Sequence, residues 1–130
     1  MVRPAAKELT QRELEVMHVF WSGGTTGQST VAEIRAQLAA AGRPLAYTTV
    51  ATLVRILTDK GFLEQTNTER PFLYRPVRSF EEVSRSILGD LVERVFHGSR
   101  EQLLVRLLEQ RRLSAKERAV LEAILREKKP

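Results

Sequence analysis

The chain has 130 residues, which is the size of one domain, or of one small domain with an appended segment. Its hydrophobic content of 42% allows a buried core and excludes wholesale disorder. The absence of cysteine excludes disulfides, thiolate metal sites and thiol catalysis. There is no apolar run of membrane-spanning length and no signal-peptide core, so we expect a soluble, cytoplasmic protein. The net charge of +5 slightly favours a polyanionic partner.

Five helix starts are marked by a capping pattern, in which Ser or Thr is followed three residues later by Glu or Gln. Each pair opens a segment of helical periodicity: Thr10–Glu13, Thr30–Glu33, Ser79–Glu82, Ser99–Gln102 and Ser114–Glu117. We therefore expect helices over about 10–22, 30–41, 80–97, 100–112 and 115–128. A Gly/Pro turn follows the second of these helices, and Pro44 prevents its continuation.

A further helix, which starts near Tyr47 without such a pair, is strongly two-faced. One face is apolar and carries Val50, Leu53, Val54 and Leu57. The opposite face carries Thr48, Ala51, Thr52 and Arg55 at the same helical spacing. An ordinary solvated face would carry Glu and Lys, which form helices better than Thr. Gly61 is the expected helix terminator.

Two short stretches after this helix predict a β-hairpin. FLEQT at 62–66 and PFLYRP at 71–76 are rich in aromatic and β-branched residues, and residues 67–70 separate them. The fold class is therefore mainly α with a small β-hairpin. We predict a winged helix-turn-helix domain over residues 1–78, in which the third helix enters the DNA major groove and the hairpin follows the backbone.

The polar face of the third helix is the candidate DNA-binding surface. Threonine offers a hydroxyl and a methyl group to base edges, and arginine reaches guanine or phosphate. Thr49 lies beside the polar stripe, as a phosphate or capping contact. Tyr47 either packs under the helix or reaches a phosphate. Arg70, in the hairpin loop, suits a phosphate or the minor groove, or is a solvated turn residue.

Residues 79–130 are predicted to form three helices with more apolar surface than they can bury alone. We expect a helical dimerisation domain in which two copies interleave. The candidate interface residues are Val83, Ile87, Leu91, Leu104, Leu108, Leu121 and Leu125.

The sequence offers no candidate catalytic or metal site. His18 and His97 are far apart and have no neighbouring Cys or His. The carboxylates belong to capping pairs and to i, i+4 pairs with Arg. We expect no enzyme activity, no metal and no cofactor.

The chain resembles the penicillinase-repressor (BlaI/MecI-like) family. The resemblance lies in LTQRELEVMHVFW at 9–21, VAEI at 31–34, AYTTVATLVRILTDKGFL at 46–63 and FLYRP at 72–76. It implies a homodimeric winged-helix repressor that binds a dyad-symmetric operator and blocks transcription. It also implies that the recognition-helix positions are Tyr47, Thr48, Thr49, Thr52 and Arg55, with Arg70 on the wing.

Two departures from the family pattern leave the inducer open. Relatives that are controlled by proteolysis carry an Asn-Phe pair in the middle C-terminal helix, which is absent around Arg106-Leu107. Copper-responsive relatives carry paired Cys-x-Cys motifs, and this chain has no cysteine. The operator and the regulated genes are also open. The alternative function is a winged-helix protein-interaction module, which would present an acidic or apolar third-helix surface.

Overall fold

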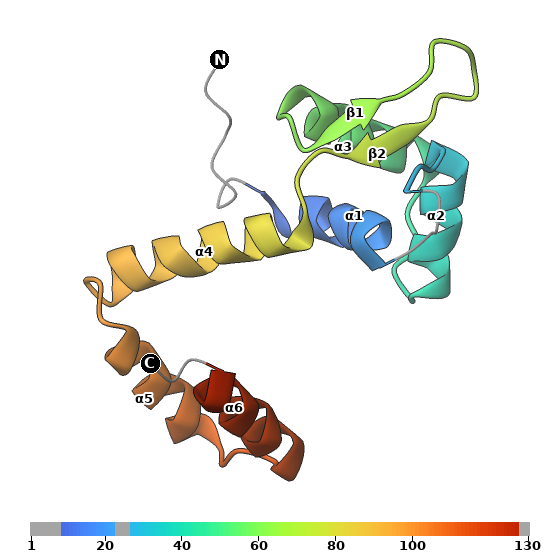
Figure 1. Ribbon diagram of the computed structural model, residues 1–130. Coiled ribbons are helices and arrows are strands. Elements are labelled where there is room, and N and C mark those ends of the chain that lie inside the picture. Colours follow the sequence, from blue (N-terminus) through green and yellow to red (C-terminus); the bar gives the residue numbers. More distant parts are fainter. Residues whose placement is uncertain (1–8, 23–26, 128–130) are drawn as a thin grey trace. The chain divides into compact units, whose positions relative to one another are not determined.

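The computed structural model describes residues 9–22 and 27–127. They form six helices and one two-stranded antiparallel sheet (Figure 1). In chain order these are α1 (Gln11–Ser22), α2 (Val31–Ala40), α3 (Tyr47–Asp59), β1 (Leu63–Gln65), β2 (Tyr74–Pro76), α4 (Phe80–Val95), α5 (Arg100–Gln110) and α6 (Ala115–Glu127). The predicted fold class is confirmed.

The chain divides into two compact units, residues 1–88 and residues 89–130, which we call the N-terminal and the C-terminal unit. The boundary between the two packed units thus lies ten residues after the predicted domain boundary at residue 78, because the first half of α4 belongs to the N-terminal unit. The assignment of DNA binding to one part and dimerisation to the other stays a prediction. No helix within the described residues is long and apolar enough to span a membrane.

The five predicted capping residues all accept a hydrogen bond from the backbone N–H three residues later. At three helix starts the Glu side chain also accepts a hydrogen bond from the backbone N–H of the cap residue. These pairs are Thr10–Glu13, Thr30–Glu33 and Ser114–Glu117. Such caps satisfy backbone donors that a helix leaves unpaired at its first turn. The start of α3 differs as predicted, since its N-cap Ala46 makes no side-chain hydrogen bond.

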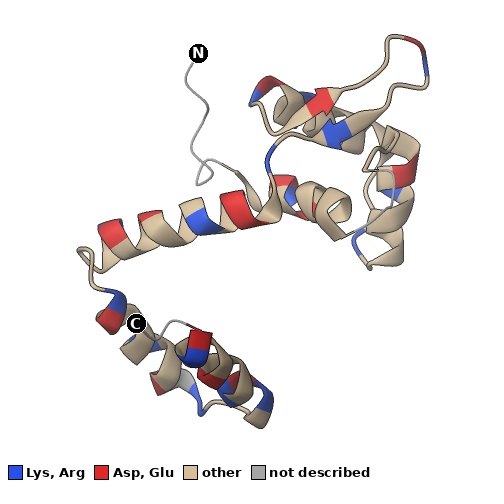
Figure 2. Ribbon diagram, in the orientation of Figure 1, with Lys and Arg blue, Asp and Glu red and all other residues tan. Residues whose placement is uncertain are grey.

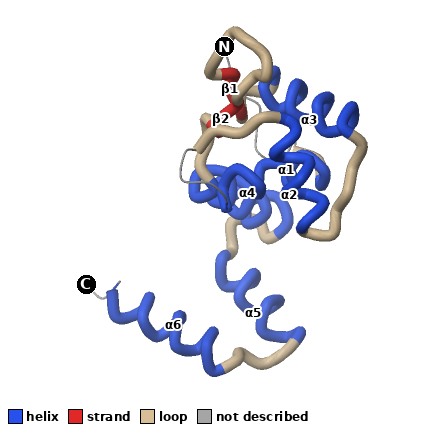
Figure 3. The backbone as a smooth tube through the Cα atoms, turned by 90° about the vertical axis from the view of Figure 1, so that its right-hand side faces the viewer, coloured by secondary structure: helices blue, strands red, loops and turns tan. Residues whose placement is uncertain are grey.

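The hydrophobic core of the N-terminal unit lies among α1, α2, α3 and the hairpin, which are packed together in Figure 3. Its fully buried members include Met17 of α1, Ile34 and Leu38 of α2, and Leu57 of α3. Phe62, just before β1, is also fully buried. Apolar residues at helical spacing account for this core, because one stripe of each helix turns inward.

One buried ion pair joins the start of α1 to the end of α3. The Glu13 side chain is 4% exposed, and its Oε1 lies 3.0 Å from Nζ of Lys60. Burial raises the pKa of Glu13, but the Thr10 backbone N–H, the Lys60 ammonium and the Thr10 side chain outweigh it and hold the pKa below its usual value of 4.5. The carboxylate thus serves two purposes, as a helix cap and as the partner of Lys60.

The hairpin is antiparallel, with Leu63 opposite Pro76 and Gln65 opposite Tyr74. Ser29, which precedes α2, pairs with the other edge of Tyr74 through two backbone hydrogen bonds of 2.9 Å each. The sequence pattern predicted the hairpin but not the pairing of Ser29 with Tyr74. The bridge fixes the start of α2 beside the hairpin.

Contacts around Trp21 attach the start of α4 to the N-terminal unit. The Trp21 indole Nε1–H donates to the backbone oxygen of Arg78 at 3.0 Å. The Arg78 guanidinium lies over the Phe62 ring at 4.8 Å and donates to Glu82 at 2.8 Å. Val83, which is 1% exposed, lies in the same core as α1 and α3.

The C-terminal unit lacks a comparable interior. None of the described residues of α6 is buried, and the apolar side chains of this unit are largely exposed. Those with large exposed surfaces are Leu91, Val95, Leu104, Val105, Leu107, Leu108, Val120, Leu121, Ile124 and Leu125.

Candidate nucleic-acid interface

The outward face of α3 is polar and exposed, as the helical spacing predicted. Val50, Val54 and Leu57 are fully buried. The exposed positions of the helix's first three turns are those of the predicted contacts: Tyr47, Thr48, Thr49, Thr52 and Arg55. Gly61 follows the helix with a φ of +85°, a left-handed conformation that favours glycine and ends the helix.

The hydroxyl group of Thr52 is already engaged within the helix. Its Oγ1–H donates to the backbone oxygen of Thr48 at 2.9 Å, which leaves the hydroxyl oxygen as an acceptor. The side chain therefore presents a methyl group and an acceptor oxygen to a ligand. A methyl group on an exposed helix face suits apolar contact with the C5-methyl group of thymine.

Arg70, in the loop between β1 and β2, is exposed, and its guanidinium carbon lies 5.2 Å from the centre of the Phe72 ring. A guanidinium over an aromatic face is attracted by the ring's electrons and keeps its N–H groups at its edge. Arg75 on β2 is instead paired with Glu64 on β1. Figure 2 shows these opposite charges on neighbouring strands, so Arg75 is a weaker candidate for a phosphate contact than Arg70.

A cavity of about 360 Å³ is lined by residues from the start of α2, the start of α3 and the hairpin. Tyr47 and Arg70 both line it, with Thr30 and Val31 from the start of α2 and Phe72 and Tyr74 from the hairpin. Two predicted contact residues that are 23 positions apart in sequence thus share one hollow. Its lining combines a phenol, a guanidinium and aromatic surface, which can hold a phosphate group and the sugar beside it.

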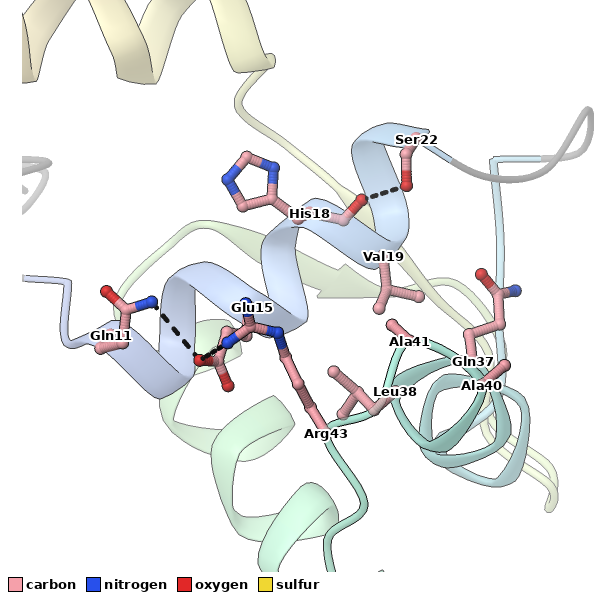
Figure 4. Close-up of a pocket in the computed structure, with 10 residues that line it drawn as sticks. All are labelled: Gln11, Glu15, His18, Val19, Ser22, Gln37, Leu38, Ala40, Ala41 and Arg43. Carbon is pink, nitrogen blue, oxygen red and sulfur yellow. Dashed lines mark hydrogen bonds and ion pairs between the residues drawn. The ribbon is translucent and has the colours of Figure 1, made fainter.

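A larger hollow of about 610 Å³ lies between α1 and the end of α2 (Figure 4). Arg43 reaches across it to Glu15 at 2.6 Å, and Val19 and Leu38 contribute apolar lining. Glu15 also pairs with Arg12 at 3.2 Å. These charged groups satisfy one another, and no residue of α3 or the hairpin lines this hollow.

The predicted dimer residues fall into two groups. Val83 is buried in the core of the N-terminal unit, and Ile87 is half-buried against it. Val83 therefore has almost no surface to give to a partner, because it belongs to the core of the N-terminal unit. The other five residues are exposed: Leu91, Leu104, Leu108, Leu121 and Leu125.

Within the C-terminal unit, a groove of about 380 Å³ runs between α5 and α6. Leu104, Leu107 and Leu108 line it from α5, and Leu121 lines it from α6. Arg111, Arg112 and Glu117 contribute charged groups to its lining. This groove gathers three of the predicted interface residues on one apolar surface.

The histidines are not assembled into a metal site. His18 contacts the rings of Trp21 and Phe80, at centroid distances of 5.2 and 5.9 Å. Across residues 9–22 and 27–127, no three side chains of His, Asp or Glu lie close enough to hold a metal ion.

Three helices followed by an antiparallel hairpin, with a polar outward face on the third helix, define the winged-helix fold. The model of the penicillinase repressor family matches residues 9–127. The chain belongs to this family.

Individual relatives agree with this assignment. The chain is 34% identical over 116 residues to the transcriptional regulator BlaI of Mycobacterium tuberculosis, in two strains, and the match covers 88% of this chain and 80% of the relative. Among solved structures, the DNA-binding domain of the repressor BlaI superposes with a TM-score of 0.51 at 23% identity, covering 62% of this chain and 93% of that one. The complex structure of hsRosR-SG gives a TM-score of 0.54 at 16% identity and covers 95% of both chains. These two structures support the winged-helix fold.

Proposed function

We propose that the chain is a homodimeric transcriptional repressor that binds a dyad-symmetric operator through α3 and the hairpin. The observation that carries this proposal is the division of α3 into two faces. Val50, Val54 and Leu57 are fully buried, whereas the threonines at 48, 49 and 52 and Arg55 face outward. A buried spine fixes the helix, so that the exposed face can enter a groove as a rigid surface.

The chemistry of this face suits DNA better than protein. The exposed positions at 47, 48, 49, 52 and 55 carry one guanidinium and no carboxylate. Arg55 is suited to pair with guanine O6 and N7, and Thr52 to contact a thymine methyl. Tyr47 and Arg70 line one cavity beside the helix, where they would contact the sugar-phosphate backbone. The protein-interaction alternative requires an acidic or apolar face here.

The C-terminal unit supports self-association. Ten large aliphatic side chains among its described residues are 38–60% exposed, and covering this remaining surface would contribute about 1 kcal/mol for each of them. A second copy of the same unit supplies a matching apolar surface without a further partner. Two linked winged helices would then bind half-sites one or more helical turns apart, and binding at the second site would be favoured by effective concentration.

Arg55→Ala tests the recognition role of α3. The operator is obtained by selecting bound duplexes from a random pool, and binding is then measured by gel-shift titration. We expect Arg55→Ala to weaken operator binding by about 1–3 kcal/mol, or roughly 5- to 150-fold, with an unchanged circular dichroism spectrum. Arg85→Ala is the control, because it removes the same charge from an exposed position on α4. Equal losses for both variants would contradict a specific role for Arg55.

Two substitutions at Thr52 sharpen the same test. Thr52→Val keeps a methyl group and removes the hydroxyl, whereas Thr52→Ser removes the methyl group. Because the Thr52 hydroxyl hydrogen is used by Thr48, we expect Thr52→Val to retain most of the affinity and Thr52→Ser to lose several-fold. The reverse order would show that the hydroxyl makes the contact.

A further inference from the structure

The side chain of Asn67 bonds to the backbone of the loop that carries Arg70 at three points. Its Nδ2 donates to the backbone oxygens of Glu69 at 2.9 Å and of Pro71 at 3.1 Å. Its Oδ1 accepts from the Leu73 backbone N–H at 2.8 Å. Both amide hydrogens and the carbonyl are therefore used on the backbone that flanks Arg70.

The two ends of this loop are closed by further hydrogen bonds. The Thr66 backbone N–H donates to the backbone oxygen of Leu73 at 2.8 Å. The side-chain Nε2 of Gln65 donates to the backbone oxygen of Asn67 at 2.7 Å. A loop of eight residues between two three-residue strands would otherwise have many conformations, and ordering it during binding would cost free energy. Because the hydrogen bonds of Asn67 already order the loop in the free protein, this cost does not arise on binding.

The same loop places Arg70 over Phe72 at the edge of the cavity that Tyr47 also lines. Phe72 is half-buried, and Tyr74, which follows it on β2, is tied to Ser29 at the start of α2. Tyr74 packs against the core of the N-terminal unit, and Phe72, two residues before it, lies under the guanidinium. A preorganised cation beside a phenol forms a two-point contact for one phosphodiester group.

We propose that Asn67 and Phe72 are positioning residues that hold Arg70 over the cavity, where Arg70 and Tyr47 together contact one backbone phosphate of bound DNA. This inference rests on the proposed function. It adds that the wing contact is prearranged in the free protein, so that affinity depends on two side chains that do not themselves bind the phosphate.

The test compares the full-length chain with Arg70→Ala, Asn67→Ala and the double variant, in gel-shift titrations on operator duplex at several salt concentrations. Each lost phosphate contact should reduce the slope of log affinity against log salt by about 0.9, so a dimer that loses the contact in both subunits should show a reduction of about 1.8. We expect Arg70→Ala and Asn67→Ala each to show this reduction together with a loss of about 5- to 10-fold at low salt. The double variant should be no weaker than Arg70→Ala alone, because both changes remove the same contact.

Substitutions of Phe72 provide a second test, in which Asn67 is unchanged. Phe72→Leu keeps apolar volume but removes the aromatic face under Arg70 and should lose several-fold, whereas Phe72→Tyr keeps that face and should lose less affinity than Phe72→Leu. Gln37→Ala, an exposed amide on α2 away from the hairpin, is the control for removing an amide and should change neither affinity nor slope.

The outcomes separate this inference from the proposed function. Additive losses for Arg70 and Asn67, or an unchanged salt slope in Asn67→Ala, would overturn the positioning role while Arg55→Ala still weakened binding. If the parent chain bound no duplex and Arg55→Ala had no effect, the proposed function itself would fail. A loss of slope in Asn67→Ala that matches Arg70→Ala supports the inference, because general loosening of the fold would not remove one phosphate contact selectively.

Discussion

The two compact units of this chain bury their apolar residues to very different extents. In the N-terminal unit, α1, α2, α3 and the hairpin enclose a core in which Val16, Met17 and Ile34 have no exposed surface. In the C-terminal unit, Leu107 is 59% exposed and Leu125 is 57% exposed, although α5 and α6 are regular helices with capped starts. Capping and helical spacing can therefore form regular helices even where the apolar side chains of those helices are not packed into a core. The first unit has a core of its own, whereas the second leaves apolar surface exposed, which we propose is covered by a second copy.

The largest expected effect is the loss of self-association in Leu108→Glu. Leu108 is 48% exposed and lines the groove between α5 and α6. A carboxylate there would be desolvated in both copies of a dimer, and an ion pair with Arg111 or Arg112, which line the same groove, would offset only part of this cost. We expect the dimer dissociation constant to rise about 1000-fold, or about 4 kcal/mol, as measured by analytical ultracentrifugation.

Glu109→Gln is the matched control for this change, since Glu109 lies on the exposed side of α5 beside Arg106. It should leave the association state unchanged. A Leu108→Glu protein that remained fully dimeric at micromolar concentration would contradict the proposed interface.

A leucine-to-alanine pair compares the two units directly. Leu57 is fully buried, so Leu57→Ala should lower the free energy of unfolding by about 3 kcal/mol through lost contacts and a cavity. This loss should be independent of protein concentration, because the cavity lies within one chain. Leu107→Ala should show a smaller loss that shrinks as the protein is diluted below the dimer dissociation constant, since its contacts belong to the dimer. Urea unfolding at two concentrations measures both, and a loss at Leu107 that is independent of concentration would argue against a shared interface.

A smaller effect is expected from the ion pair that ties α1 to α3. Lys60→Met would leave the buried Glu13 carboxylate without its cation and should cost about 2 kcal/mol at pH 7. Because the pKa of Glu13 is lower in the folded chain, its contribution is present above the unfolded value near 4.5 and is lost as the pH falls through the folded value. Lys60→Met should therefore also flatten the fall in stability as the pH drops below about 4.5.

The exposed pair between Arg75 and Glu64 is the control for that experiment. Both side chains are about half exposed, and surface pairs contribute only about 0–1 kcal/mol. Arg75→Met should thus change the unfolding free energy little at any of these pH values. Similar losses for the two variants would show that burial of Glu13 does not decide the strength of its pair.

Most of the local structure could be predicted from the sequence. Capping pairs such as Thr30–Glu33 are short-range patterns, and they located five helix starts. The two faces of α3 followed from spacing alone, with Val54 buried and Thr52 exposed. These predictions succeed because both signals depend on residues within one or two turns of each other.

Contacts between distant residues could not be predicted in the same way. Glu13 matched a capping pattern, but its pairing with Lys60 joins positions 47 apart. Val83 fitted an apolar stripe equally well as an interface residue or a core residue, and only packing against the N-terminal unit decides that it is core. Asn67 was predicted only as part of a turn, because its three backbone partners depend on the path of the whole loop. The signal that could have indicated its role is the preference of Asn for bonding to nearby backbone.

The setting of Trp21 has a practical consequence for such measurements. It is the single tryptophan of the chain, it donates to the Arg78 oxygen, and its ring contacts His18 and Phe80. Both tyrosines, Tyr47 and Tyr74, also lie before residue 89. Intrinsic fluorescence therefore comes from the N-terminal unit alone, whereas the far-ultraviolet signal of helices comes from both units. The two spectroscopic signals, recorded on one unmodified sample, report separately on the self-sufficient unit and on the whole chain.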